Sequence, residues 1–300
     1  MYAELVCLSN FSFLKGASHP EELVQRADEL GYQALAITDE CSVSGVVRAY
    51  EATQQRDIKL IIGSRFNLDD DLTLVLLARD LRGYAQLCRL ITRARRHASK
   101  GQYHLQRSDL ETQLEHCVAL LLTDNEQHIA WFREYFTGRG WLALALLREG
   151  TDAQRLKHAL ACSQRYQLPL VAIGDVYMHA RGRRALQDVL SAIRLNQPLS
   201  ALGGALLSNG ERHLRSLDEL RELYPHNLLQ ESLKIAAQCT FSLHQLTYHY
   251  PDDVTPAGLS AQQFLRQLTE QGMARRWPQG CPAAVRSQIE HELQLIAELQ

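Results

Sequence analysis

Residues 34–45 read ALAITDECSVSG, and the interpretation of the whole fold starts from this stretch. Its first five residues are apolar on both faces, which is typical of a strand inside a parallel sheet covered by helices. Asp39 and Glu40 follow where the strand should end. Functional groups gather at the C-terminal ends of parallel strands. The stretch therefore raises the question of whether these two carboxylates bind a metal ion.

Similar apolar runs of strand length recur through the first half of the chain. They cover residues 3–9, 59–66, 72–79, 117–123, 141–147 and 168–174. Helical segments separate most of them, and the clearest helix begins with a capping box at Ser18 and Glu21. Only the runs at 59–66 and 72–79, which are joined by NLDDD at 67–71, lack a helix between them. This pattern predicts an α/β fold of seven strands, either an open doubly wound sheet or a closed barrel.

The character of the sequence changes after residue 200. A loop-rich stretch leads into helical segments, and a Pro-rich linker interrupts them at 248–260. The predicted helices cover residues 216–224, 227–239, 260–277 and 283–300. We therefore expect an α/β domain at 1–200 and a loop and helical extension at 201–300. The sequence stops inside an amphipathic pattern, which suggests a larger protein.

Composition excludes several classes of protein. Of the 300 residues, 46% are hydrophobic, and 32 Lys and Arg against 34 Asp and Glu give a net charge of −2. This balance gives no overall electrostatic reason for a polyanionic partner. The seven cysteines form no CxxC pair, so neither a disulfide framework nor a thiolate zinc site is expected. Without a signal peptide or an apolar span, we expect a cytoplasmic protein with no membrane contact.

Two groups of residues are candidates for chemistry. The strand ends collect Asp39, Glu40, Arg65, Asp175, Tyr177 and His179. Carboxylates and imidazoles there could hold Mg²⁺, Mn²⁺ or Zn²⁺ for phosphoester hydrolysis, or the aspartates could simply cap the segments that follow. A predicted helix at 83–100 carries Arg89, Arg93, Arg95, Arg96 and Lys100. This basic group could contact DNA phosphates or form an ordinary solvated face.

Three longer segments carry a resemblance to a known family. They are YAELVCLSNFSFLKGASHPEELVQRADELGYQALAITDECSVSGVVRA (2–49), GDVYMHARGRRALQDVLSAI (174–193) and NGERHLRS (209–216). Over essentially all 300 residues the chain resembles the N-terminal region of bacterial C-family, DNA polymerase III alpha-like enzymes, in their error-prone branch. The resemblance implies a polymerase-and-histidinol-phosphatase (PHP) domain. Such a domain is a distorted seven-stranded (β/α) barrel with up to three metal ions at its C-terminal rim.

The family's metal ligands are largely replaced in this sequence. In metal-competent members the first strand carries HxH, the second ends in TDH, the third carries a Glu, and a late strand ends in DxH. The corresponding positions here, with their neighbours, form a vestigial pocket of Glu4, Val6, Leu8, Asp39, Glu40, Arg65, Asp175, Tyr177 and His179. Because Arg65 places a fixed positive charge beside the carboxylates, we predict an ion-pair network and no bound metal. A single weak metal site made by the carboxylates and His179 is the alternative.

The resemblance also implies a role for the chain. In this family the aspartates that hold Mg²⁺ for nucleotidyl transfer lie in the palm, expected beyond Gln300, so no catalytic residue or cofactor is expected here. The whole protein would be an error-prone DNA-directed DNA polymerase acting on DNA and dNTPs in translesion synthesis and repair. Its expected partners are a sliding clamp and accessory proteins of error-prone repair. This chain would be a scaffold without proofreading nuclease activity. The alternative is a metal-dependent phosphoesterase of the PHP family.

Overall fold

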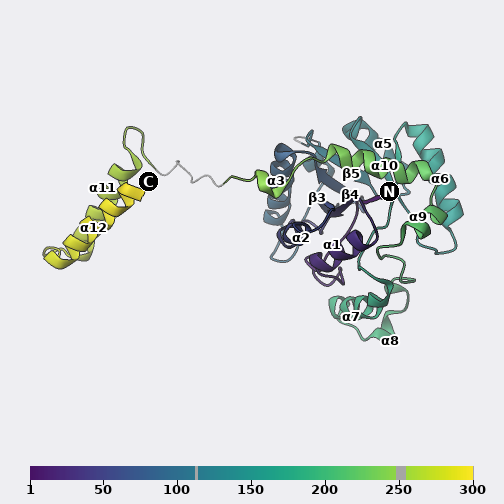
Figure 1. Ribbon diagram of the computed structural model, residues 1–300, viewed down its shortest axis with the longest axis horizontal. Helices are drawn as coiled ribbons and strands as arrows, with labels where there is room; N and C mark the ends of the chain where they lie inside the picture. The colour runs from purple at the N-terminus through teal and green to yellow at the C-terminus, as the bar shows by residue number, and fades with distance from the viewer. Residues whose placement is uncertain (112–113, 248–254, 300) are drawn as a thin grey trace. The chain divides into compact units, whose positions relative to one another are not determined.

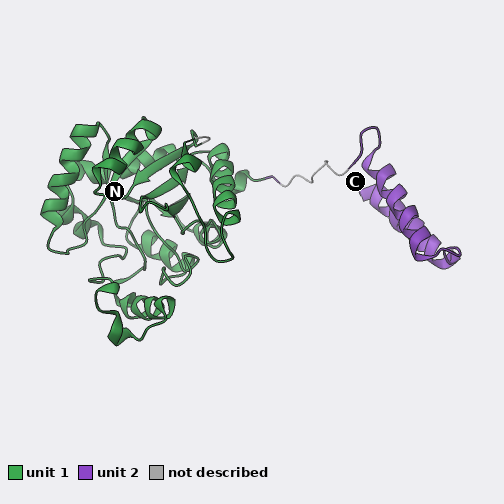
Figure 2. Ribbon diagram, turned by 180° about the vertical axis from the view of Figure 1, so that it is seen from behind, with its two compact units in different colours: residues 1–246 green, residues 247–300 purple. Residues whose placement is uncertain are grey.

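The computed structural model describes residues 1–111, 114–247 and 255–299. The chain divides into two compact units, residues 1–246 and residues 247–300, which are coloured separately in Figure 2. Residues 248–254 of the predicted linker lie outside the described residues.

A seven-stranded sheet with strand order β1 to β7 forms the centre of the first unit. The strands are β1 (Ala3–Glu4), β2 (Ala34–Ile37), β3 (Lys59–Asn67), β4 (Thr73–Ala78), β5 (Cys117–Leu121), β6 (Gly140–Ala145) and β7 (Leu170–Ile173). Neighbouring strands are parallel except that β4 is antiparallel to β3 and β5. The short NLDDD connection explains this, because a parallel crossover needs about a dozen residues. The predicted α/β barrel of seven strands is confirmed.

The barrel closes between its first and last strands through a few contacts beyond the strand ends. Leu8 N donates to Val176 O at 2.8 Å, and Val176 N donates to Val6 O at 2.9 Å. The predicted first strand at 3–9 is wrong in length, since only Ala3 and Glu4 are strand. Its next two backbone amides, those of Leu5 and Val6, donate to the Glu4 carboxylate at 3.1 and 3.0 Å in place of a ladder partner.

Helices surround the strands, as Figure 1 shows. In the first half they are α1 (Pro20–Glu29), α2 (Val46–Thr53), α3 (Leu81–Arg96), α4 (Arg107–Leu110), α5 (Glu126–Phe136) and α6 (Asp152–Tyr166). The capping box of α1 lies one residue later than predicted, with His19 as N-cap and Glu22 accepting from His19 N at 2.9 Å. Pro20 explains the shift, because proline suits the first helical position and lacks the amide that an interior position would need.

The first unit continues well past residue 200. It contains η1 (Arg181–Arg183), α7 (Arg184–Leu195), α8 (Leu199–Leu202), η2 (Gly203–Ala205), α9 (Leu217–Leu223), α10 (His226–Gln238) and η3 (Leu243–Gln245). Helix α10 packs against β1 and β7, and Ala3 N donates to the Ser232 hydroxyl at 3.1 Å. The barrel therefore shares one compact unit with α9 and α10, and the domain division at residue 200 stays a prediction.

The second unit is a pair of helices, α11 (Ala261–Arg276) and α12 (Ala283–Leu299). Arg266 on α11 forms a two-pronged ion pair with Glu290 on α12, with both nitrogen to oxygen distances at 2.9 Å. The predicted helices at 260–277 and 283–300 are thus confirmed within a residue or two for the part of the chain that is described. No helix in residues 1–111, 114–247 or 255–299 combines the length and the apolar character needed to cross a membrane.

Candidate functional site

Asp39 is fully buried just after β2 and holds the loop that follows β1. Its Oδ1 accepts from Ser9 N at 2.8 Å and from the Ser12 hydroxyl at 2.7 Å, while its Oδ2 accepts from the Ser9 hydroxyl at 2.7 Å. Burial raises the pKa of Asp39, although these hydrogen bonds oppose the shift. Both carboxylate oxygens are therefore occupied by serines of the 9–16 loop.

Glu40 points to different partners from those of its neighbour Asp39. It forms an ion pair with Lys15 and accepts at Oε1 from Tyr103 Oη and Asn67 Nδ2, each at 3.0 Å. Burial alone would raise the pKa of Glu40, but the hydrogen bond and charge of Lys15, helped by Tyr103 and Asn67, lower it. Glu40 is thus held as a carboxylate by groups that the sequence analysis did not identify.

Asp175 lies between two arginines at the end of β7. Arg65 Nη1, from β3, donates to Asp175 Oδ1 at 2.8 Å, and Arg212 pairs with Oδ2. The ring of Tyr177 lies under both guanidiniums, with its centroid 6.0 Å from Arg65 Cζ and 5.1 Å from Arg212 Cζ. Burial and the neighbouring charge of Arg65 lower the pKa of Arg212 to about 10. The expected contact of Arg65 with Asp175 is present, and Arg212 adds a second cation.

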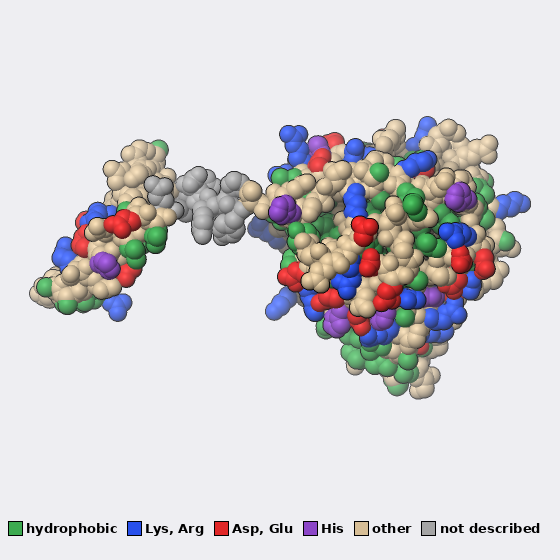
Figure 3. Space-filling model, viewed as in Figure 1, with side chains coloured by type: hydrophobic (Ala, Val, Ile, Leu, Met, Phe, Trp, Pro, Cys, Tyr) green, Lys and Arg blue, Asp and Glu red, His purple; other side chains and the backbone are tan. Residues whose placement is uncertain are grey.

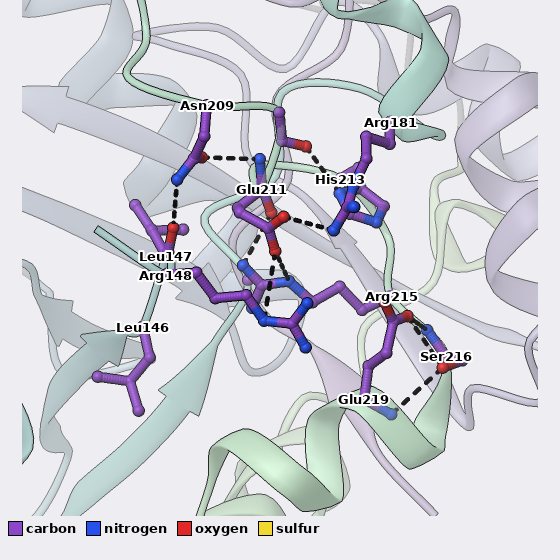
Figure 4. Close-up of polar contacts among 12 residues, drawn as sticks. Leu146, Leu147, Arg148, Arg181, Asn209, Glu211, His213, Arg215, Ser216 and Glu219 are labelled. Atoms are coloured by element: carbon purple, nitrogen blue, oxygen red, sulfur yellow. Dashed lines mark hydrogen bonds and ion pairs between the residues drawn. The ribbon is translucent and has the colours of Figure 1, made fainter. Parts of the chain in front are cut away.

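Arg212 comes from the NGERHLRS segment, whose other charged side chains are mostly buried. Figure 4 shows Glu211 pointing toward arginines from three parts of the chain. Arg181 pairs with its Oε1, while Arg215 Nε lies 3.5 Å and Arg148 Nε 3.9 Å from its Oε2. Burial lowers the pKa of His213 in the same segment. Glu211 and Arg215 are the buried members of this network, which holds the segment from which Arg212 reaches Asp175.

The remaining residues of the predicted pocket do not meet at one point. Val6 and Leu8 are fully buried apolar side chains. The Glu4 carboxylate accepts from Gly174 N at 2.9 Å and from Tyr2 Oη at 3.0 Å, so it joins the start of the barrel to its last strand. His179 turns to the Ser18 hydroxyl, 2.8 Å from its Nδ1. Within the described residues, no group of three or more His, Cys, Asp or Glu side chains is arranged to hold a metal ion.

A cavity of about 240 Å³ opens beside Asp175 at the ends of β5, β6 and β7. Arg65, Arg155 and Arg212 line its polar side, and Leu122, Leu142 and Leu144 are among its apolar lining. Arg155 and Arg212 were missed by the sequence analysis. Arg212 belongs to the NGERHLRS motif at 209–216. That segment has no helical or strand periodicity, so its sequence does not indicate which side chain points toward the strand ends.

The basic residues predicted on α3 fall on two sides of that helix. Arg89, Arg93 and Arg96 are exposed and line one shallow groove. Arg93 Nη1 also lies 3.7 Å from Asp109 Oδ1, which is not part of the groove's lining. Arg95 turns to the rim, where its Nη2 donates to Cys41 O at 3.1 Å and to Glu40 O at 3.3 Å. Lys100 is exposed just beyond the helix. The structure thus separates Arg95 from the other arginines.

Comparison with known proteins places this geometry in a family. The model of the PHP domain matches residues 4–170. Proteins named error-prone DNA polymerase are 55% identical over 300 residues in Pseudomonas aeruginosa and 53% identical over 303 residues in Methylococcus capsulatus. These matches cover 99% and 100% of this chain, and the chain spans 29% of the length of each relative.

Solved structures show a more distant likeness. An amidohydrolase from Chromobacterium violaceum with bound sulfate and no metal has a TM-score of 0.46 at 15% identity, over 59% of this chain and 88% of that chain. A lesion-specific endonuclease from Pyrococcus furiosus has a TM-score of 0.42 at 10% identity, over 59% of this chain and 48% of that chain. No function is transferred from likenesses of this size. The family match and the curated relatives lead to one conclusion: the chain belongs to the PHP domain family, and its expected resemblance to bacterial error-prone DNA polymerases is confirmed.

Proposed function

We propose that this chain is the non-catalytic scaffold part of an error-prone DNA polymerase and that its PHP pocket holds ion pairs in place of metal ions. The observation that carries the proposal is the position of Asp175 between Arg65 and Arg212. A divalent cation beside Asp175 would have to displace two guanidiniums, whose positive charges also repel it.

The other carboxylates support the same proposal. Asp39 gives both oxygens to serine and backbone donors, and Glu40 is paired with Lys15. Metal-dependent hydrolysis needs several converging carboxylate or imidazole ligands around each ion. These side chains, already held by protein partners, do not fit a divalent cation.

A metal titration with activity assays tests this proposal. We expect titration of Mn²⁺ or Zn²⁺ to give the same binding curve for the unmodified chain and for the Asp39→Asn variant, because Asp39 and its neighbouring carboxylates already have protein partners. We also expect no phosphatase or 3′-exonuclease turnover with either metal. Turnover that disappears in the Asp39→Asn variant would instead support the metal-dependent phosphoesterase alternative.

The activity of the whole protein is a further part of the proposal. It rests on the relatives named error-prone DNA polymerase. The full-length protein would extend DNA with dNTPs using Mg²⁺ held by its palm, in the cytoplasm, during translesion synthesis and repair. A sliding clamp and error-prone repair proteins would recruit it. Primer extension across a damaged template by the full-length protein tests this part.

We also propose that the exposed face of α3 contacts DNA phosphates. Arg89, Arg93 and Arg96 share this face and line a groove with Cys88, Thr92 and His97, while Asp109, which pairs with Arg93, stands outside that lining. Phosphate contacts of this kind add affinity without sequence preference.

A further inference from the structure

Helix α7 is oriented with its polar face inward. Gln187 and Ser191, one turn apart, are only 3% and 4% exposed. Leu186, Val189 and Ile193 face outward, and Ile193 is 59% exposed. Amphipathic helices normally bury their apolar side, because each apolar side chain removed from water stabilises the fold by about 1.5–3 kcal/mol. The orientation of α7 therefore indicates a partner for its outer face.

The loop between β1 and α1 adds an aromatic side chain to the same surface. Phe13 is 81% exposed at the tip of this loop, and the next residue, Leu14, has φ = +58°. A positive φ is costly for a side chain such as leucine. The loop is nonetheless held firmly, since Ser9 and Ser12 bond to Asp39 and Lys15 pairs with Glu40. The carboxylates of the vestigial pocket thus fix the loop that presents Phe13.

Two shallow grooves connect these side chains. A groove of about 290 Å³ is lined by Phe13, Leu186 and Leu190 among others, and one of about 470 Å³ by Val189, Ile193 and Leu199. Figure 3 shows apolar side chains gathered over α7 and α8. We call the exposed side chains of Phe13, Leu186, Val189, Ile193 and Leu199 the α7 surface. Contiguous exposed apolar surface of this kind marks an interaction site.

We propose that, in the full-length protein, the α7 surface is covered by an apolar face of the same polypeptide that lies outside the 300 residues. The chain spans 29% of the length of its curated relatives, so most of such a protein would be available to cover it. This inference rests on the proposed scaffold function, and the α7 surface is where the scaffold would contact the rest of the polypeptide.

Cysteine labelling of the full-length protein tests the inference. Ile193→Cys and the matched control Val47→Cys, on α2, replace side chains that are 59% and 55% exposed in this chain. Maleimide labelling of each variant is followed by peptide-resolved mass spectrometry, which separates the new thiol from native Cys88 and Cys281. We expect the Ile193→Cys variant to label at least about tenfold more slowly than the control in the full-length protein, and at a similar rate in the 300-residue chain.

Three outcomes would overturn the inference. An Ile193→Cys labelling rate that is as fast in the full-length protein as in the 300-residue chain would mean that the α7 surface is free. Slow labelling in the 300-residue chain, or protection that depends on protein concentration, would mean that residues of this chain or a second copy cover it.

Hydrogen exchange of α7 peptides in the unmodified full-length protein, expected to be slower than in the 300-residue chain, checks the result without a variant. Metal-dependent turnover, by contrast, would overturn the proposed function. The turnover assay and the labelling rates are separate measurements, so the two failures can be told apart.

Discussion

Arg65 and Asp175 are 110 residues apart in sequence and are joined by a 2.8 Å hydrogen bond at the mouth of the barrel. We expect Arg65→Met to lower the free energy of unfolding by about 1–3 kcal/mol, because Asp175 would lose one of its two charged partners in a site largely closed to water. Urea denaturation measures this change.

The matched control for Arg65→Met is Arg48→Met. Arg48 pairs with Glu21 on the surface, where both side chains are well exposed. Its loss should cost about 0.5 kcal/mol or less. Equal losses from the two substitutions would show that the rim pair contributes no more than a surface ion pair.

The buried carboxyl of Glu4 should make stability depend on pH. Burial raises the pKa of Glu4 from 4.5 to about 7, against the hydrogen bonds that it accepts from Val6 N, Gly174 N and Tyr2. The folded protein therefore binds this proton more tightly than the unfolded chain does. Its contribution to stability is complete below pH 4.5 and is lost as the pH rises through about 7.

Glu4→Gln isolates this contribution. The amide oxygen can accept the backbone N–H groups, and the amide nitrogen can donate to Tyr2 Oη. Between pH 4.5 and pH 8 the unmodified protein should lose about 3 kcal/mol relative to the variant, measured by urea denaturation at both pH values. A stability difference that does not change with pH would contradict the prediction.

Asp39 should act as an anchor for the 9–16 loop. We expect Asp39→Ala to cost about 2–3 kcal/mol, because three donors of Ser9 and Ser12 would lose a buried acceptor. Asp39→Asn is the control, since its oxygen keeps two of these donors and its amide can donate to the Ser9 hydroxyl. Hydrogen exchange should therefore speed up across residues 9–16 in the alanine variant and much less in the asparagine variant.

The exposed face of α3 should be the part of this chain that senses DNA. Replacing Arg89 and Arg96 together by serine should weaken binding to DNA and reduce the slope of log affinity against log salt by about 2. Arg165→Ser, on α6, is the control and should leave the slope nearly unchanged. Fluorescence anisotropy with a labelled duplex at several salt concentrations gives both numbers, and an unchanged slope in the double variant would remove α3 from the proposed contacts.

Local sequence patterns predicted most of the elements. The helix expected at 216–224 forms as α9, Leu217–Leu223, because its apolar spacing and the capping box of Ser216 and Glu219 are local features. The first strand was overestimated because its apolar residues 5–8 look like a strand, whereas their hydrogen bonds depend on Glu4 and on partners far along the chain.

The candidate site was predicted only in part. Asp39 and Asp175 follow apolar runs, Arg65 lies near the end of one, and comparison with a family motif picks them out. Arg212 and Lys15 lie in loops, where no periodicity indicates the direction of a side chain. His179 lies two residues past Tyr177, which suggested that it faces the same site, but its imidazole bonds to the Ser18 hydroxyl.

The seam between β1 and β7 has a consequence for how the protein folds. Glu4 and Gly174 are 170 residues apart, and their contact is among the few bonds that close the barrel. Contacts between such distant residues cost the most chain entropy and tend to form slowly. We therefore expect the seam to be the last part of the barrel to form and the first to open. Replacing Glu4 by alanine should then speed unfolding and leave the refolding rate nearly unchanged.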